Sequence, residues 1–171
     1  MTFVTDHLER AGVRFEVLPH QPARTAVDRA RTLGMHPDEV VEVLVLEITT
    51  GPAIAVFPAS RLLDIELVRA ALRDPSARLA TEPGIRARFP EFELGAVPAL
   101  PTVVHVPAVI DHPVLERRQV TFAAGVQRTS VRVGTELLLH GPTVTIAEIS
   151  RPTATDDQQV AGATRGPAVT G

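Results

Sequence analysis

The sequence predicts one α+β domain with a mixed, largely antiparallel sheet. The length comes first: 171 residues, 44% hydrophobic and 22% charged, supply one ordinary hydrophobic core but not two. In addition, short apolar runs with strand periodicity interleave with segments of helical periodicity. Finally, most connections between the later runs are too short for the helical crossover that joins parallel strands, which favours antiparallel or mixed pairing.

The first third of the chain alternates helix and strand patterns. A short helix is predicted to end at Gly12, and the run VRFEVLP then alternates like a half-buried strand. From Thr25 apolar residues recur at helical spacing until Gly34, a typical helix stop. Residues 40–60 predict two strands joined by a turn at Gly51-Pro52.

The rest of the chain continues with helices and then strands. Asp64 is a candidate N-cap for a helix that ends before Pro75, and another helix is predicted to begin near Thr81. Residues 90–101 contain several prolines and a glycine and are predicted to be loop. Later apolar runs predict strands at VVHVPAVI, QVTFA, TSVRV and TVTIAEI, with TELLLH as a helical stretch.

Composition also predicts the domain limits and the location. Residues 1–151 are predicted to fold, whereas residues 152–171 lack apolar periodicity and are predicted to be a disordered tail. The sequence contains no apolar stretch long enough to span a membrane, and charges interrupt its N-terminal segment. We therefore expect a cytoplasmic protein without membrane contact.

Absent residue types limit the chemistry. The sequence has no cysteine, which excludes disulfides and thiolate metal sites. It also has no lysine, so all 17 basic residues are arginines and mechanisms that need a side-chain amine are excluded. The net charge of -3 argues against a protein that coats nucleic acid non-specifically. No spacing of His, Asp and Glu suits a metal, and no glycine-rich phosphate loop is present, so we expect no metal and no cofactor.

Glu42 is a carboxylate inside the first long apolar run, between Val41 and Val43. One explanation is that Glu42 faces solvent from an edge strand. Another is that it pairs with an arginine, such as Arg24 or Arg61. A third explanation, a place in a binding pocket, depends on the comparison that follows.

The order and spacing of many segments resemble the YbaK family, also called the prolyl-tRNA-synthetase-associated editing domain. The segments are HLERAGVRFEVLPH, ARTAVDRARTLG, VVEVLVLEI, VFPASRLLDIELVRAAL, ARLATEPGI, PEFELGAVPAL, VIDHPVLE and VTFAAGVQRTSVRV, from about Phe3 to Pro152. The resemblance implies a mixed sheet rolled toward a barrel, with helices packed outside. It also implies a deacylase that hydrolyses the ester of mischarged aminoacyl-tRNA in trans, with aminoacyl-tRNA and a tRNA synthetase as candidate partners.

The same resemblance locates the site and shows where this chain departs from the family. Family members carry a lysine after two apolar residues of the first long strand, where this chain has Glu42. They carry Gly, a small residue and His after a late strand, where this chain has Gly125, Val126 and Gln127. The family's Pro-Phe-Gly becomes residues 99–101, Ala-Leu-Pro. Scaffold motifs are therefore kept while chemical ones change.

The implied site has two catalytic positions, Glu42 and Gln127. The implied substrate-binding residues are Thr25, Val43, Gly95, Ala96, Val97, Pro98 and Gly125. Simpler explanations exist for several candidates: Thr25 also suits a helix N-cap, His20 suits loop packing, and Asp111 suits a turn that binds backbone N–H groups.

Two functions remain open from the sequence. The first is an active deacylase, in which an ionised Glu42 about 4 Å from a developing oxyanion would repel it by roughly 4 kcal/mol. In that case Glu42→Lys, alone or with Gln127→His, is expected to raise the deacylation rate about tenfold or more. Alternatively, a Glu42 with a pKa raised by burial is a general base, with backbone N–H groups near Gly95 as oxyanion donors. The second function is a non-catalytic module that binds a small ligand, an RNA end or a protein.

Overall fold

The structure is a computed structural model that describes residues 1–153. The predicted tail, residues 152–171, therefore lies almost entirely outside the described residues. The helices are α1 Phe3–Arg10, α2 Ala26–Leu33, α3 Ile65–Leu72, α4 Glu82–Arg88 and α5 Pro101–Val104, with 3₁₀ turns η1 Pro37–Glu39, η2 His112–Glu116 and η3 Thr135–Leu139. The strands are β1 Phe15–Pro19, β2 Val41–Ile48, β3 Gly51–Pro58, β4 Arg61–Leu63, β5 Arg78–Leu79, β6 Ala108–Asp111, β7 Gln119–Val126, β8 Thr129–Gly134, β9 Val144–Ala147 and β10 Ser150–Pro152.

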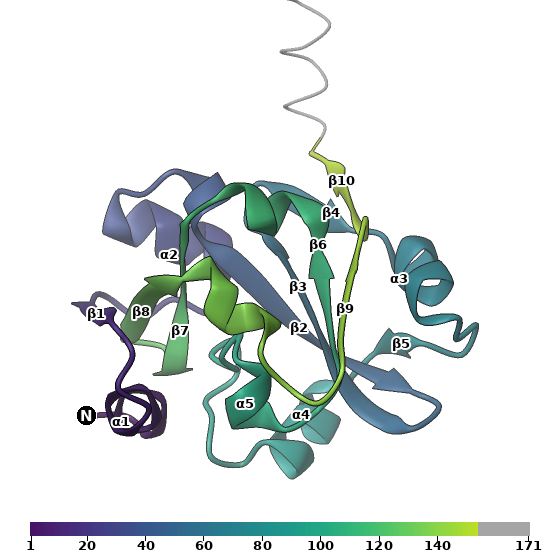
Figure 1. The fold of residues 1–171 in the computed structure, drawn as a ribbon, viewed down its shortest axis with the longest axis horizontal. Coiled ribbons are helices and arrows are strands. Elements are labelled where there is room, and N and C mark those ends of the chain that lie inside the picture. The colour runs from purple at the N-terminus through teal and green to yellow at the C-terminus, as the bar shows by residue number, and fades with distance from the viewer. Residues whose placement is uncertain (154–171) are drawn as a thin grey trace, which may run out of the picture.

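The strands form three sheets, in which antiparallel pairs outnumber parallel ones (Figure 1). The largest has the order β5-β2-β3-β6-β9, and only β3–β6 and β6–β9 are parallel. The second sheet is β1-β8-β7 and the third is the pair β10-β4. A parallel bridge between Val40 and Thr121 links the first two sheets. The predicted α+β class with a mixed, largely antiparallel sheet is confirmed, although the described strands do not close into a barrel.

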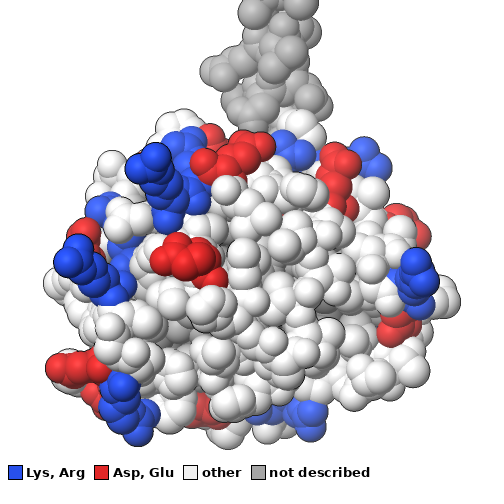
Figure 2. Space-filling model, viewed as in Figure 1, with Lys and Arg blue, Asp and Glu red and all other residues white. Residues whose placement is uncertain are grey.

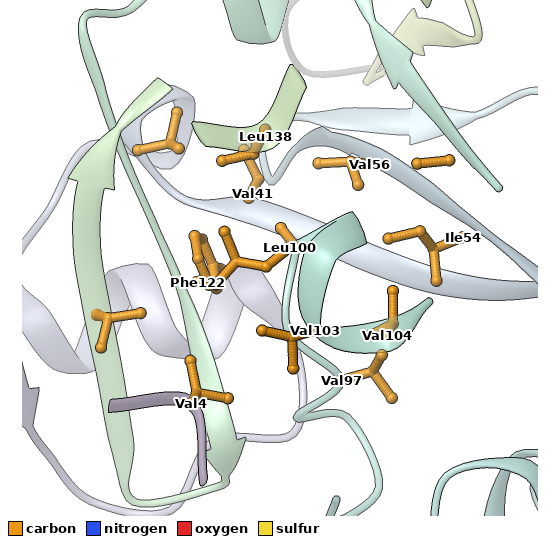
Figure 3. Close-up of a cluster of buried hydrophobic side chains, with 14 of the residues drawn as sticks. Val4, Val41, Ile54, Val56, Val97, Leu100, Val103, Val104, Phe122 and Leu138 are labelled. Carbon is orange, nitrogen blue, oxygen red and sulfur yellow. The ribbon is translucent and has the colours of Figure 1, made fainter. Parts of the chain in front are cut away.

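The core explains why β3 reads as an unbroken apolar run. Ile54 and Val56 belong to the main hydrophobic cluster, between the largest sheet and the β1-β8-β7 sheet (Figure 3). Ala53 and Ala55 face the opposite way and pack with Val68 of α3 in a second cluster. Since successive side chains of a strand point to opposite faces, a strand covered on both faces must be apolar throughout.

Three sequence predictions are corrected by the structure. VVHVPAVI is not one strand, because Pro101 begins α5 and only Ala108–Asp111 joins the sheet. The hairpin turn is formed by Thr49 and Thr50, and Gly51 already belongs to β3. Only Val144–Ala147 of TVTIAEI forms a strand, β9, because the chain leaves the largest sheet at Glu148 and then pairs with β4 through β10, which begins after the run.

Asp111 ends β6 and is fully buried, so it is not a turn residue. It accepts a hydrogen bond from the Ile149 N–H at 2.9 Å and another from the Ser150 hydroxyl. The carboxylate therefore fastens the segment before β10 to the end of β6.

Helix α2 lies on the side of the domain away from β10 and α3, near the β7 and β8 strands and the start of β2 (Figure 1).

Candidate functional site

Glu42 lies at the first turn of α2, not on a solvent-facing edge. The backbone N–H of Ala26, the first residue of α2, donates to Glu42 Oε2 with 2.7 Å between nitrogen and oxygen. Thr25 is the N-cap, and its hydroxyl accepts the Asp28 N–H at 3.1 Å. The first N–H groups of a helix have no partner within the helix and carry its positive end. The local structure around position 42 is therefore suited to an anion.

Arg29, one turn into α2, is the arginine whose charge acts on the pKa of Glu42. Arg29 is only 1% exposed, and its charge interacts with that of Glu42. The arginines suggested by the sequence have other partners. Arg24 pairs with Glu82 at 3.6 Å, and Arg61 donates to the Ser150 hydroxyl at 2.6 Å. The suggested pairing of Glu42 with Arg24 or Arg61 is wrong.

Burial raises the pKa of Glu42 above the ordinary value of 4.5, because a desolvated carboxylate prefers its neutral form. The Ala26 N–H and the Arg29 charge oppose this rise in pKa without cancelling it, whereas Asp28 adds to it. Burial also lowers the pKa of Arg29, while Glu42 acts to raise it. The two groups thus support each other's charged forms in a poorly solvated place.

The loop of residues 93–98 packs directly against the segment that leads into α2. Gly95 has φ +76°, and a Cβ there would lie 2.1 Å from the carbonyl oxygen of Arg24. No other residue fits this approach. Arg29 Nη2 joins the same two segments, because it donates to the Ala23 carbonyl at 3.2 Å and to the Gly95 carbonyl at 3.3 Å.

Gln127 is part of the same assembly but lies in the turn between β7 and β8. Its side-chain amide donates to the Leu94 carbonyl at 2.9 Å, and its backbone N–H donates to a Glu93 carboxylate oxygen at 3.0 Å. Its carbonyl accepts the Ala23 N–H at 3.0 Å. Gln127 therefore follows the late strand β7 and is not itself on a strand. Gln127 instead holds the loop in place.

The remaining predicted residues surround this assembly in different ways. Thr25 and Gly95 are exposed, and Val43 is half-buried against the main core cluster. Three residues of the loop are buried, with Val97 itself in the main core cluster; these are Ala96, Val97 and Pro98. Gly125 is buried with φ +88°, and a Cβ there would meet the Phe92 ring at 3.0 Å. The loop residues after Gly95 therefore anchor the loop to the core.

Three backbone donors in the loop, the N–H groups of Leu94, Gly95 and Val97, have no acceptor within residues 1–153. Gly95 and Val97 flank Ala96, whose N–H is bonded to the Glu93 carbonyl at 3.0 Å. Such donors can stabilise a negatively charged oxygen. The His20 imidazole, in contrast, is held between Ser130 Oγ at 2.7 Å and the Gln21 carbonyl at 2.6 Å. His20 therefore packs its loop.

Large surface cavities lie away from Glu42. One of about 590 Å³ is lined by Val13, Arg14, Arg118, Gln119, Gly134, Glu136 and Leu137. On the face shown in Figure 2, arginines are interspersed with acidic residues around a broad uncharged centre. Within the described range, no three His, Asp or Glu side chains gather as a metal site would require. No helix among those residues has the length and hydrophobicity to span a membrane.

Arg29 is the residue that sequence reasoning missed. The helix from Thr25 was predicted from its apolar positions, and Arg29 is three residues after Ala26, on the same face of the helix. A charged residue on the predicted buried face was the available signal. Its partner could not be named from the sequence, because Gly95 is distant along the chain.

Comparison with solved structures supports the fold. A protein described as "hypothetical protein APE2540" has a TM-score of 0.75 at 22% identity, covering 86% of this chain and 99% of the other. A "putative trans-editing enzyme for prolyl tRNA synthetase" has a TM-score of 0.73 at 25% identity, covering 86% and 94%. A "putative signal transduction protein" from Marinobacter aquaeolei VT8 has a TM-score of 0.66 at 17% identity, covering 95% of this chain and 36% of the other. A search of curated proteins gave no match.

The sequence profile of the family described as "aminoacyl-tRNA editing domain" matches residues 20–140. The matched region includes α2, β2, the loop of residues 93–98 and the turn that holds Gln127. It thus contains every segment of the assembly around Glu42. This chain belongs to the aminoacyl-tRNA editing domain family.

Proposed function

We propose that this protein is an aminoacyl-tRNA deacylase that acts in trans on mischarged tRNA, with Glu42 as the general base. The observation that carries the proposal is the position of Glu42, a half-buried carboxylate with a raised pKa near the place where α2, β2 and the loop of residues 93–98 meet. Family membership supports the ester of aminoacyl-tRNA as the substrate. The cytoplasm is the setting that this substrate implies, and a tRNA synthetase is a candidate partner.

The proposed reaction needs a base that is ionised at neutral pH and still basic. Glu42 takes a proton from a water molecule whose oxygen bonds to the ester carbonyl carbon. The bond from that carbon to the ribose oxygen then breaks, and the proton passes from Glu42 to the ribose oxygen. Burial suits Glu42 to both steps, because a carboxyl group with a raised pKa accepts and returns a proton more readily near neutral pH. Glu42 Oε2 accepts the Ala26 N–H, so Oε1 is the oxygen that we assign to the water.

The tetrahedral intermediate needs donors for its oxyanion. The N–H groups of Gly95 and Val97 have no acceptor in the described part of the chain, so they are the donors we assign. Loss of one such donor commonly raises a barrier by about 2.7 to 4 kcal/mol. Gln127 cannot serve as a base, since an amide does not take up a proton at neutral pH. Its hydrogen bond to Leu94 supports the loop that carries the donors.

A deacylation assay with a matched pair of variants tests the proposal. We expect the wild type to deacylate at least one member of a panel of mischarged tRNAs faster than buffer does, and Glu42→Gln to lose about a hundredfold in kcat. Glu47→Gln is the control, because it makes the same change on the same strand at a residue outside the site. Wild-type activity in Glu42→Gln would exclude the carboxylate as the base.

A non-catalytic binding function is the second candidate. It is favoured by the internal contacts of Glu42 with Ala26 and Arg29, and by the location of the large cavities elsewhere. Under this function, the protein binds uncharged tRNA or its 3′ end, and no mischarged tRNA in the panel is deacylated faster than in buffer. Deacylation measured beside equilibrium binding therefore separates the two candidates.

A further inference from the structure

Arg29 is an unusual residue because its whole side chain is buried. It is 1% exposed and is among the largest fully buried side chains of the described residues. Burial of a guanidinium is costly unless its charge and its donors are compensated. Here one nitrogen, Nη2, makes both of its hydrogen bonds, and Nε is buried without a partner in the described part of the chain. Such an incompletely satisfied group calls for a role beyond packing.

The two acceptors of Arg29 belong to segments that are far apart in the sequence. Ala23 precedes α2, and Gly95 lies in the loop that carries the unpaired N–H groups. The loop also passes Arg24 so closely that only glycine fits. The guanidinium thus sets the distance between the start of α2, where Glu42 is bound, and the loop that carries the proposed oxyanion donors.

The charge of Arg29 acts on Glu42 as well. The charged groups that influence Glu42 are Arg29, which favours the carboxylate, and Asp28, which opposes it. Asp28 is itself paired with the exposed Arg31 at 3.3 Å. Arg29 is therefore the cation that offsets the burial of Glu42.

We propose that Arg29 is the positioning residue of this site: its guanidinium fixes the loop of residues 93–98 to the start of α2 and supplies a positive charge that acts on Glu42. The role in catalysis rests on the proposed deacylase function. The structural role, on the loop and on the charge of Glu42, does not. Arg29 touches neither substrate nor water in this proposal and acts through Glu42 and Gly95.

The effect of the charge is tested by titration of the Glu42 carboxyl carbon by NMR. In Arg29→Met the pKa of Glu42 is expected to rise above that of the wild type, because the favourable charge of Arg29 is lost. In Arg29→Lys, which keeps a positive charge, it is expected to stay close to the wild-type value. Arg10→Met is the control, because Arg10 is exposed on α1 and is not among the charges that act on Glu42, so the Glu42 titration is expected to stay nearly unchanged. An unchanged titration in Arg29→Met would overturn the role of the charge.

The effect of the two-carbonyl contact is tested with Arg29→Lys, because an ammonium lacks the planar fork of the guanidinium. We expect the Ala96 amide, bonded to the Glu93 carbonyl inside the loop, to exchange with solvent at least about tenfold faster. Deacylation is expected to fall about tenfold with the pKa of Glu42 nearly unchanged. Wild-type exchange and wild-type deacylation in Arg29→Lys would overturn the contact.

Two further measures keep the proposal testable. If Arg29→Met does not fold, Arg29→Gln takes its place, since it retains a donor without the charge, and the same rise in the pKa of Glu42 is expected. The NMR measurements require no turnover. An inactive wild type with the expected NMR changes would disprove the deacylase function and leave the Arg29 proposal standing. An active wild type whose Arg29 variants show no NMR change would disprove the Arg29 proposal and leave the deacylase function standing.

Discussion

A shielded carboxylate lies near each end of β2, and the two carboxylates differ in the hydrogen bonds that they accept. Beyond the end of β2, Asp74 is 8% exposed and accepts four hydrogen bonds. These come from the Thr49 N–H at 2.7 Å, the Thr49 hydroxyl at 3.0 Å, the Ser76 N–H at 3.0 Å and the Ser76 hydroxyl at 2.6 Å. Near the start of β2, Glu42 accepts the Ala26 N–H.

The pKa values of the two groups move in opposite directions. The Ser76 hydroxyl and the Thr49 N–H, with the other bonds, lower the pKa of Asp74 to about 2. Burial raises the pKa of Glu42, because the N–H groups of Ala26 and Val43 and the Arg29 charge do not replace the lost water. A carboxylate saturated with donors remains an anion and fastens the β2–β3 turn to the segment after α3. A carboxylate with few donors keeps its affinity for a proton, which is the property that catalysis needs.

The largest expected effect is that of Glu42→Lys. A lysine at position 42 loses the Ala26 hydrogen bond, places a cation at the positive end of α2, and leaves Arg29 without its counter-charge. We expect a loss of about 3 kcal/mol in the free energy of unfolding, measured by urea denaturation. The sequence alone leads to the opposite expectation, a rise in deacylation. A Glu42→Lys variant that is as stable as the wild type and more active would restore that expectation.

Gly95→Ala is expected to have a smaller but still large effect on the same end of β2. A methyl group would lie 2.1 Å from the Arg24 carbonyl oxygen, so the loop must move and the Arg29 bond to Gly95 is lost. We expect a loss of about 2 to 3 kcal/mol in unfolding free energy. Gly12→Ala is the control, because Gly12 has a similar φ of +68° with nothing within 4 Å of the added methyl. It is expected to cost about 1 kcal/mol, and equal losses would show that the close contact is unimportant.

The smallest effects come from neutralising each carboxylate, and their pH dependence has opposite signs. Stability from Asp74 is present above its ordinary pKa of 3.8 and is lost as the pH falls through about 2, so Asp74→Asn should lower Tm at pH 7 and do so less in acid. For Glu42 the folded pKa is raised, so stability is greatest below 4.5 and declines as the pH rises. Glu42→Gln should therefore lower Tm at pH 7 less than Asp74→Asn does, although Arg29 loses its counter-charge. Melting curves from pH 2 to 8 measure the change in Tm for Asp74→Asn and Glu42→Gln. The same pH dependence of that change in both variants would contradict the comparison.

The sequence by itself determined the α+β class, the helix that begins after Thr25, the β2–β3 pair and the place of Glu42 within a strand. These features depend on local spacing, caps and apolar periodicity, which a short window of sequence contains. The order of segments also indicated the family that the profile over residues 20–140 confirms. The fold class needed no contact between distant residues to be recognised.

Only the tertiary structure decided what surrounds Glu42. The contact between Arg29 and Gly95 joins residues from separate parts of the chain, and nothing local to either one specifies the other. The same is true of Gln127 and Leu94, where a predicted catalytic position holds a loop. The pKa of Glu42 depends on how much water these segments exclude and on which charge they place beside it. Burial and electrostatic interaction are properties of the folded chain, so the chemistry of this carboxylate could not be read from its neighbours in sequence.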